Sequence, residues 1–141
     1  MVKKPVLRIN ANLVNHSGPV IDCKINNMQT QACIDSGSTF TIQPYAFFKT
    51  LNISESRLNK SISYTIDSAS HHNENAVFGS ILLNVLVQIS DGSMETFRQK
   101  FLILKPELKL KIILFGNDFL YSNNGKIEYC QMSRKVKVNL N

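Results

Sequence analysis

One carboxylate stands in a run of small polar residues, the sequence DSGST at residues 35–39, directly after the apolar stretch ACI. An apolar strand would carry Asp35 into a tight turn made of hydroxyl groups and a glycine. Such a turn could simply join two strands, because Asp, Ser and Gly all suit tight turns. It could instead present a carboxylate for acid–base catalysis, and the segment taken alone leaves both interpretations open.

Hydrolysis of a peptide by carboxylates would place specific demands on this turn. Two carboxylates must lie a few ångströms apart and share one proton, so that one activates water while the other protonates the carbonyl oxygen. The surrounding loop must donate hydrogen bonds to their outer oxygens. Gly37 would allow a close approach of the backbone, and Ser36 and Ser38 are short donors next to Asp35. The residue types of the turn therefore suit this chemistry.

A second segment, some eighty residues later, has a complementary pattern. The apolar residues 112–115 lead to Gly116, which is followed by the polar pair Asn117 and Asp118 and then by the apolar pair Phe119 and Leu120. This order predicts a buried strand, a close backbone approach at the glycine and a short helix that Asp118 could cap.

Together the two segments resemble the retropepsins, the aspartic proteases of retroviruses and retrotransposons. The resemblance covers about residues 21–138, and the order of the parts agrees: a hairpin before the first motif, a polar flap-like tip between the motifs, and closing strands after the helix. It implies an all-β fold, a closed acid-protease barrel with one short C-terminal helix, in a homodimer. It also implies a single retropepsin-like domain over residues 1–141, with its core at about residues 20–138, and no cofactor.

The resemblance further implies roles in catalysis. Asp35 would face Asp35 of a second copy, because the chain has one Asp-Ser-Gly motif and its other aspartates stand in unrelated contexts. Ser36 would tie the two catalytic loops together, and Ser38 would orient the outer carboxylate oxygen. The second motif would thread behind the catalytic loop and support it. The supporting residues expected there are Phe115, Gly116, Asn117 and Asp118.

The implied substrate is an extended peptide at a polyprotein junction, held by strand-like hydrogen bonds with apolar residues near the scissile bond. The Gly37 carbonyl would hold its backbone, and a flap near residues 69–73 would close over it. Residues 135–140, and also residues 6–9, are candidates for the dimer interface. The expected substrate-binding residues are Gly37, Thr39, Ser68, Ala69 and Ser70.

Some features depart from the familiar retroviral pattern. The flap tip has no glycine, and the interval between the two motifs is longer than in compact viral enzymes. Thr39 and Asn117 stand where many retroviral enzymes carry an acidic residue and its arginine partner, and this joint change predicts a different polar bridge. Phe115 is bulkier than the small aliphatic residue expected there. These departures favour a retrotransposon or domesticated enzyme, and a weak or inactive module for dimerisation or peptide binding is the alternative function.

The elements that must position these residues follow from the hydrophobic pattern, which is mostly of period two. We expect a hairpin with its turn at Asn26 and Asn27, a short helix that starts at Pro44, a loop at residues 52–60, a polar hairpin tip at residues 67–75 and a bend at Gly79. The expected strands are residues 6–10, 21–25, 28–34, 39–42, 61–66, 77–89, 97–104, 108–115, 126–130 and 135–140.

Composition limits the class of protein. The 141 residues are 43% hydrophobic, and the longest apolar run is strand-sized, so no membrane span is expected. The odd cysteine count predicts reduced, mostly buried thiols, and the adjacent His71 and His72 have no third ligand nearby, so no metal site is expected. We expect a location in the cytoplasm or within a virus-like particle.

The net charge of +6 raises the question of a nucleic-acid partner. Basic residues recur in residues 98–111 and 134–137, where they alternate with apolar residues, as outward positions on half-buried strands do. A basic nucleic-acid-binding barrel is the third functional hypothesis. No RNA-binding motif with interleaved aromatic residues supports it, so a nucleic-acid partner is not expected.

Overall fold

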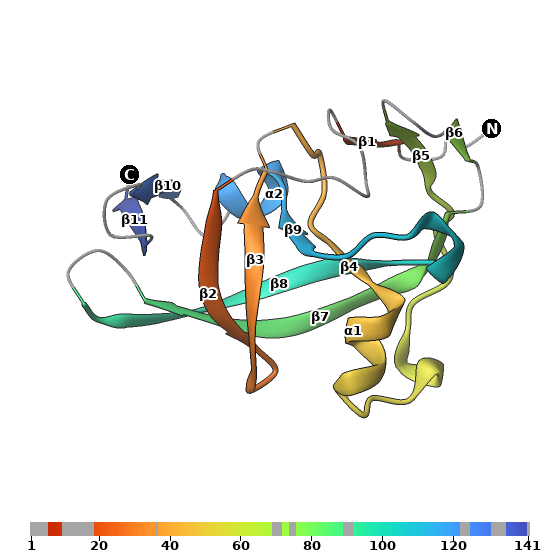
Figure 1. Ribbon diagram of the computed structural model, residues 1–141, viewed down its shortest axis with the longest axis horizontal. Coiled ribbons are helices and arrows are strands. Elements are labelled where there is room, and N and C mark those ends of the chain that lie inside the picture. Colours follow the sequence, from red (N-terminus) through yellow and green to blue (C-terminus); the bar gives the residue numbers. More distant parts are fainter. Residues whose placement is uncertain are drawn as a thin grey trace.

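The computed structural model describes residues 6–9, 19–35, 37–68, 72–73, 76–88, 92–121, 125–130 and 135–140. Its main strands are β2 (Val20–Ile25), β3 (Met28–Ile34), β4 (Ile42–Pro44), β7 (Val77–Gln88), β8 (Met94–Leu104) and β9 (Ile113–Phe115). They close into a barrel in the order β2-β3-β9-β4-β8-β7 (Figure 1). The predicted all-β closed barrel is therefore confirmed.

The hairpin before the first motif is formed by β2 and β3. Its two-residue turn has positive φ at both central residues, 50° at Asn26 and 69° at Asn27. Asparagine tolerates this conformation, and a turn of this kind matches the twist of the flanking strands. Ile25 pairs with Met28, and the register continues to Val20 and Cys33. The predicted hairpin is confirmed, and it leads directly into Asp35.

The longest ribbon of the barrel is the antiparallel pair of β7 and β8, which Figure 1 shows as two strands lying along one another. From Ile81 onwards the side chains of β7 alternate between inside and outside, so that Ile81 and Leu83 are buried while Leu82 is half-exposed. The register shifts between Val77 and Gly79, where the sequence predicts a bend.

The apolar stretch before the second motif forms a shorter strand than predicted. The sequence predicts a strand over residues 108–115, but β9 begins only at Ile113. Pro106–Leu108 forms a 3-10 turn, and Lys109 has a φ of 56°, which is incompatible with a strand. Only the last three residues pair with β3, in parallel.

The described part of the chain also contains two short helices and, besides Pro106–Leu108, a second 3-10 turn. The predicted short helix is present as α1 (Tyr45–Thr50), which starts one residue later than predicted because Pro44 is its extended N-cap residue, with a φ of −71°. The predicted loop at residues 52–60 contains the 3-10 turn η1 (Glu55–Arg57). The helix α2 (Asn117–Leu120) begins after Gly116 with no side-chain cap, so the expected capping role of Asp118 is wrong.

Two smaller sheets lie outside the barrel. In the first, β1 (Val6–Ile9) pairs in parallel with β5 (Thr65–Ser68), which also pairs with β6 (His72–Asn73). The predicted strand at residues 61–66 is displaced, because residues 61–64 are not in a strand. In the second, β10 (Gly125–Cys130) and β11 (Lys135–Leu140) form the predicted closing hairpin. The tip of the polar hairpin, residues 69–71, lies outside the described residues.

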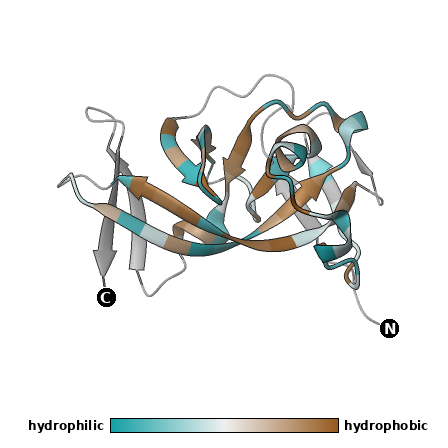
Figure 2. Cartoon of the chain, turned by 90° about the horizontal axis from the view of Figure 1, so that it is seen from below, coloured by the Kyte–Doolittle hydropathy of each residue, from teal (hydrophilic) through white to brown (hydrophobic). Residues whose placement is uncertain are grey.

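The core is rich in aromatic side chains. Phe48, Phe101, Phe115 and Phe119 are almost completely buried, and the rings of Phe115 and Phe119 stack with centroids 4.3 Å apart. Figure 2 shows the apolar segments gathered on the strands that cross the barrel. Burial raises the pKa of the Cys23 thiol to about 12, which keeps that thiol protonated. No helix in the described parts of the chain has the length and apolar character needed to cross a membrane.

Candidate active site

The first motif begins where β3 ends. The Asp35 N–H donates to the Phe115 carbonyl over 2.9 Å, so the parallel pairing of β3 and β9 continues into the motif. The Gly37 N–H donates to Asp35 Oδ1 over 2.9 Å, and the Ser38 N–H donates to the Asp35 carbonyl over 3.1 Å. The turn thus folds around the carboxylate, which is half-buried.

Ser38 supports this turn in a way that the sequence did not indicate. Its side chain is fully buried, and its hydroxyl donates to the Phe40 carbonyl over 2.7 Å. A hydroxyl has one proton to donate. In this structure that proton is used on the backbone, and a backbone N–H, that of Gly37, donates to the carboxylate oxygen.

The second motif closes against the first at Gly116. A β-carbon on this residue would lie 2.5 Å from the Phe40 carbonyl oxygen and 2.7 Å from that of Ser38, distances that real β-carbons do not show. The next residue, Asn117, donates its N–H to the Ser38 carbonyl over 2.9 Å. The glycine is therefore required by the close approach of two backbones.

A polar bridge joins the second motif to Thr41, which directly precedes β4, and to Gln99 of β8. The Thr41 hydroxyl donates to Asp118 Oδ1 over 2.6 Å and accepts from the Gly116 N–H over 3.1 Å. The Gln99 amide donates to Asp118 Oδ2 over 3.1 Å. Thr41 and Gln99 are both buried.

Sequence reasoning predicted a polar bridge other than an acid–arginine pair but missed its members, although one signal was available. Gln99 lies between Phe97 and Phe101 at inward-facing positions of β8, where an apolar residue would be ordinary. A buried amide of this kind needs a hydrogen-bond partner, and Asp118 supplies it. As predicted, the bridge differs from the acid–arginine pair of many retroviral enzymes; its members are Thr41, Asp118 and Gln99.

Comparison with solved structures settles the fold. The retropepsin-like aspartic protease from Rickettsia conorii matches with a TM-score of 0.55 at 18% identity, over 86% of this chain and 81% of that one. The retroviral protease-like domain of Ddi1 from Leishmania major matches with a TM-score of 0.57 at 15% identity, over 88% of this chain and 92% of that one. The chain has the fold of the retropepsin-like aspartic proteases. No family model and no curated protein sequence matches it.

Within this retropepsin-like barrel the structure brings together some of the predicted site residues. Asp35, Gly37 and Ser38 share the turn with Gly116 and Asn117 of the second motif, as described above. Thr39 follows in a half-buried bend. Ser68 is the last residue of β5, so its backbone is in the strand that leads to the expected flap. Three predicted residues lie outside the described residues: Ser36, Ala69 and Ser70.

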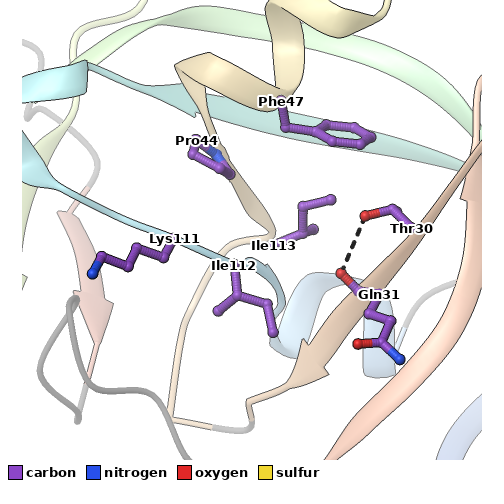
Figure 3. A pocket seen from close by; sticks show the side chains of 7 residues that line it. All are labelled: Thr30, Gln31, Pro44, Phe47, Lys111, Ile112 and Ile113. Carbon is purple, nitrogen blue, oxygen red and sulfur yellow. Dashed lines mark hydrogen bonds between the residues drawn. The ribbon is translucent and has the colours of Figure 1, made fainter.

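A separate hollow of about 330 Å³ opens at the other end of the paired strands β3 and β9 (Figure 3). Thr30 and Gln31 approach it from one side, and Pro44 and Phe47 from the other. Gln31 precedes Asp35 by four residues of extended chain, which is roughly 13 Å at the rise of a strand. This hollow of the retropepsin-like barrel is therefore distinct from the turn that carries the carboxylate.

Proposed function

We propose that this chain is an aspartic endopeptidase that works as a homodimer, with Asp35 of each copy forming one catalytic pair. The observation that carries this proposal is the interlocking of the two motifs around Asp35. Bonds to Phe115 and Gly37 fix the residue at the end of a parallel strand pair, and Gly116 permits the close packing behind it. A turn that merely joined two strands would not need this support.

The second carboxylate of the pair would have to come from another copy. Of the other aspartates that the structure describes, Asp118 already accepts bonds on both oxygens, and Asp22 accepts from Gln31 on the exposed face of the hairpin. Asp67 is exposed on β5. None of these three belongs to the turn at Asp35. A two-fold axis would place two identical turns face to face, which is the contact that a symmetric dimer makes.

The paired carboxyls would share one proton. One carboxylate takes a proton from water as the water oxygen attacks the peptide carbonyl carbon, and the other carboxyl gives its proton to the carbonyl oxygen. Collapse of the tetrahedral intermediate then breaks the C–N bond: the leaving nitrogen takes up a proton from one carboxyl, and a hydroxyl of the intermediate gives its proton to the other, which restores the single shared proton. Because the pair works with one proton, we expect the highest cleavage rate at mildly acidic pH.

An extended peptide from a polyprotein junction fits this proposal as substrate. It would add to the site as a strand, with its backbone held by the Gly37 carbonyl on one side and by the flap on the other. Thr39, Ser68, Ala69 and Ser70 are the remaining residues that we propose for this contact. The single domain would dimerise through its terminal strands, β11 and β1, and would act in the cytoplasm or within a virus-like particle.

The deciding experiment is cleavage of a peptide library by the wild-type chain and by the Asp35→Asn variant. We expect the variant to keep its fold and its dimer, and to lose cleavage at every pH from acidic to neutral. Asp22→Asn is the matched control, because it removes a carboxylate from the outside of the hairpin, and it should cleave normally. Cleavage by the Asp35→Asn variant would rule out the mechanism.

Mixing the two proteins tests the shared site. If each active dimer needs Asp35 from both copies, an excess of the Asp35→Asn variant should drive wild-type cleavage towards zero, while an excess of Asp22→Asn should not lower it. If wild-type chains exchange partners with an excess of Asp35→Asn chains and cleavage is unchanged, the two copies do not share one catalytic pair. If a confirmed wild-type dimer cleaves no peptide at any pH from acidic to neutral, the alternative of a module for dimerisation or peptide binding is favoured.

A further inference from the structure

A basic hollow of about 290 Å³ lies on the outer face of the barrel. Three of its lining side chains are cationic: Arg57, Arg98 and Lys100. None of the lining residues is acidic, and all of them belong to the described part of the chain. The remaining lining residues are Asn59, Ser80, Ile81 and Leu82.

The register of β7 and β8 places two of these cations next to an apolar side chain. Leu82 pairs with Lys100, and Asn84 pairs with Arg98. Cross-strand partners point to the same face of a sheet, and the neighbours of Leu82 along β7 are buried, so these four side chains face outward together. Leu82 is 52% exposed, which is unusual for a leucine on this strand and leaves an apolar spot among the charges.

The third cation comes from η1, which is fixed against the first part of β7, before the pairing of β7 with β2 begins at Val85. Asn59 and Ser80 exchange two backbone hydrogen bonds of 2.8 and 3.0 Å. Gly79 permits this contact, because a β-carbon there would lie 2.9 Å from the Asn59 carbonyl oxygen. Arg57 precedes this bridge by two residues and is exposed, so its position beside the hollow is set by the fold.

The three positive charges are not neutralised within the described part of the chain. The Arg98 guanidinium donates to the neutral Asn84 amide over 3.2 Å, and a guanidinium has further N–H groups to donate. The Lys100 ammonium donates to the Tyr64 hydroxyl over 3.2 Å and lies over its ring. These neutral partners orient the cations and leave their charge available to a ligand.

We propose that this basic hollow binds an acidic peptide segment that carries an apolar side chain. Carboxylates would pair with Arg57, Arg98 and Lys100, and the apolar side chain would cover Leu82. Charge complementarity would set the orientation of the segment, and burial of Leu82 would add affinity. A single-stranded nucleic acid fits less well, since no aromatic ring lines the hollow for its bases to stack on.

The barrel order separates this hollow from the turn at Asp35. Strands β7 and β8 are divided from β3 and β9 by β2 on one side and by β4 on the other. A segment bound at the hollow would therefore lie on another wall of the barrel. Its binding does not depend on the proposed catalysis, and if the chain is a protease, the hollow would hold part of a protein substrate away from the scissile bond.

The test is binding of a short fluorescent peptide of alternating glutamate and leucine, followed by fluorescence anisotropy at low ionic strength. The full chain with Asp35→Asn is used, so that cleavage cannot remove the peptide. Replacing both arginines (Arg57→Gln with Arg98→Gln) should weaken binding about fivefold or more, and Leu82→Ser should weaken it about threefold. The matched control replaces two exposed lysines elsewhere (Lys24→Gln with Lys111→Gln) and should change binding less than about twofold.

Any one of four results with the peptide would overturn the proposal. These are no binding at low ionic strength, equal losses in the arginine pair and the lysine pair, equal binding of a peptide with glutamine in place of glutamate, and no effect of Leu82→Ser. A uridine oligomer that binds more tightly than the peptide would also overturn it, in favour of a nucleic-acid site. Thermal melting of each variant checks that the fold is kept. The binding test does not depend on cleavage, so a wild-type chain that cleaves no peptide would contradict the proposed protease function and leave the proposed binding site standing.

Discussion

Two parallel strands that lie side by side, β3 and β9, each lead into a polar segment that carries an aspartate, and the two aspartates have different surroundings. Asp118 accepts bonds from side chains of two other segments, Thr41 and Gln99, and so joins α2 to the barrel wall. Oδ1 of Asp35 accepts from the backbone of its own turn, at Gly37. The Asp118 carboxylate, which bonds to several segments, stabilises the fold. The Asp35 carboxylate is positioned by its own turn, as a residue with a role in catalysis would be.

Among variants that test this difference between the two aspartate segments, we expect Gly116→Ala to lower the stability of the fold most. The new β-carbon would meet two backbone carbonyl groups, which cannot move aside as a flexible side chain can. We expect a loss of at least about 3 kcal/mol in the free energy of unfolding, measured by urea denaturation.

Gly92→Ala is the control for that measurement. Gly92 has a φ of 92° but no neighbour within 4 Å of an added β-carbon, so its substitution adds backbone strain without a clash. A cost of roughly 1–2 kcal/mol is expected there. If both variants lose the same free energy of unfolding, the tight backbone contact at Gly116 does not stabilise the packing of the two motifs.

The next largest loss of stability is expected from Asp118→Asn, and its comparison with Asp35→Asn tests the two aspartates directly. In Asp118→Asn one carboxylate oxygen becomes an NH2 group, which would face a donor, either the Thr41 hydroxyl or the Gln99 amide. A mismatched buried donor costs about 1–3 kcal/mol, so we expect a clear fall in the urea midpoint. Asp35→Asn should leave the free energy of unfolding within about 0.5 kcal/mol of wild type. Equal losses of stability in the two variants would contradict the conclusion that Asp118 stabilises the fold and Asp35 does not.

The smallest effect concerns Ser38, which belongs to the turn of one aspartate but bonds to the backbone near the other motif. Ser38→Ala removes the buried bond to the Phe40 carbonyl and should cost about 1 kcal/mol in the free energy of unfolding. Ser61→Ala, at an exposed site, is the control and should be near neutral. Since the bond supports the loop, peptide cleavage should persist in Ser38→Ala; a loss as complete as in Asp35→Asn would instead assign Ser38 to the carboxylate.

Local patterns predicted the parts of this fold that local chemistry controls. The turn at Asn26 and Asn27 and the start of α1 after Pro44 depend on backbone preferences of the residues themselves. The strand before the second motif was predicted too long, because its apolar alternation hides a 3-10 turn and the left-handed conformation of Lys109. Periodicity reports which side chains are buried, and it does not report which residues are paired.

In the candidate site, the sequence singled out Asp35 and the glycines but not the members of the polar bridge. Asp35 and Gly116 belong to short motifs whose residue types can be recognised. Thr41 and Asp118 are 77 residues apart, and they meet only because the barrel closes. A contact of that kind has no local signature, except for the polar Gln99 at an inward position of β8.

The dependence of the Asp35 turn on Gly116 has a consequence for how the protein is made. The ribosome releases Asp35 some eighty residues before the segment that packs behind it, and closing so long a loop carries an entropic cost that only the finished barrel offsets. A nascent chain that stops short of Gly116 cannot hold its carboxylate in the geometry described. Synthesis itself would thus delay the appearance of the site until nearly the whole barrel has been translated.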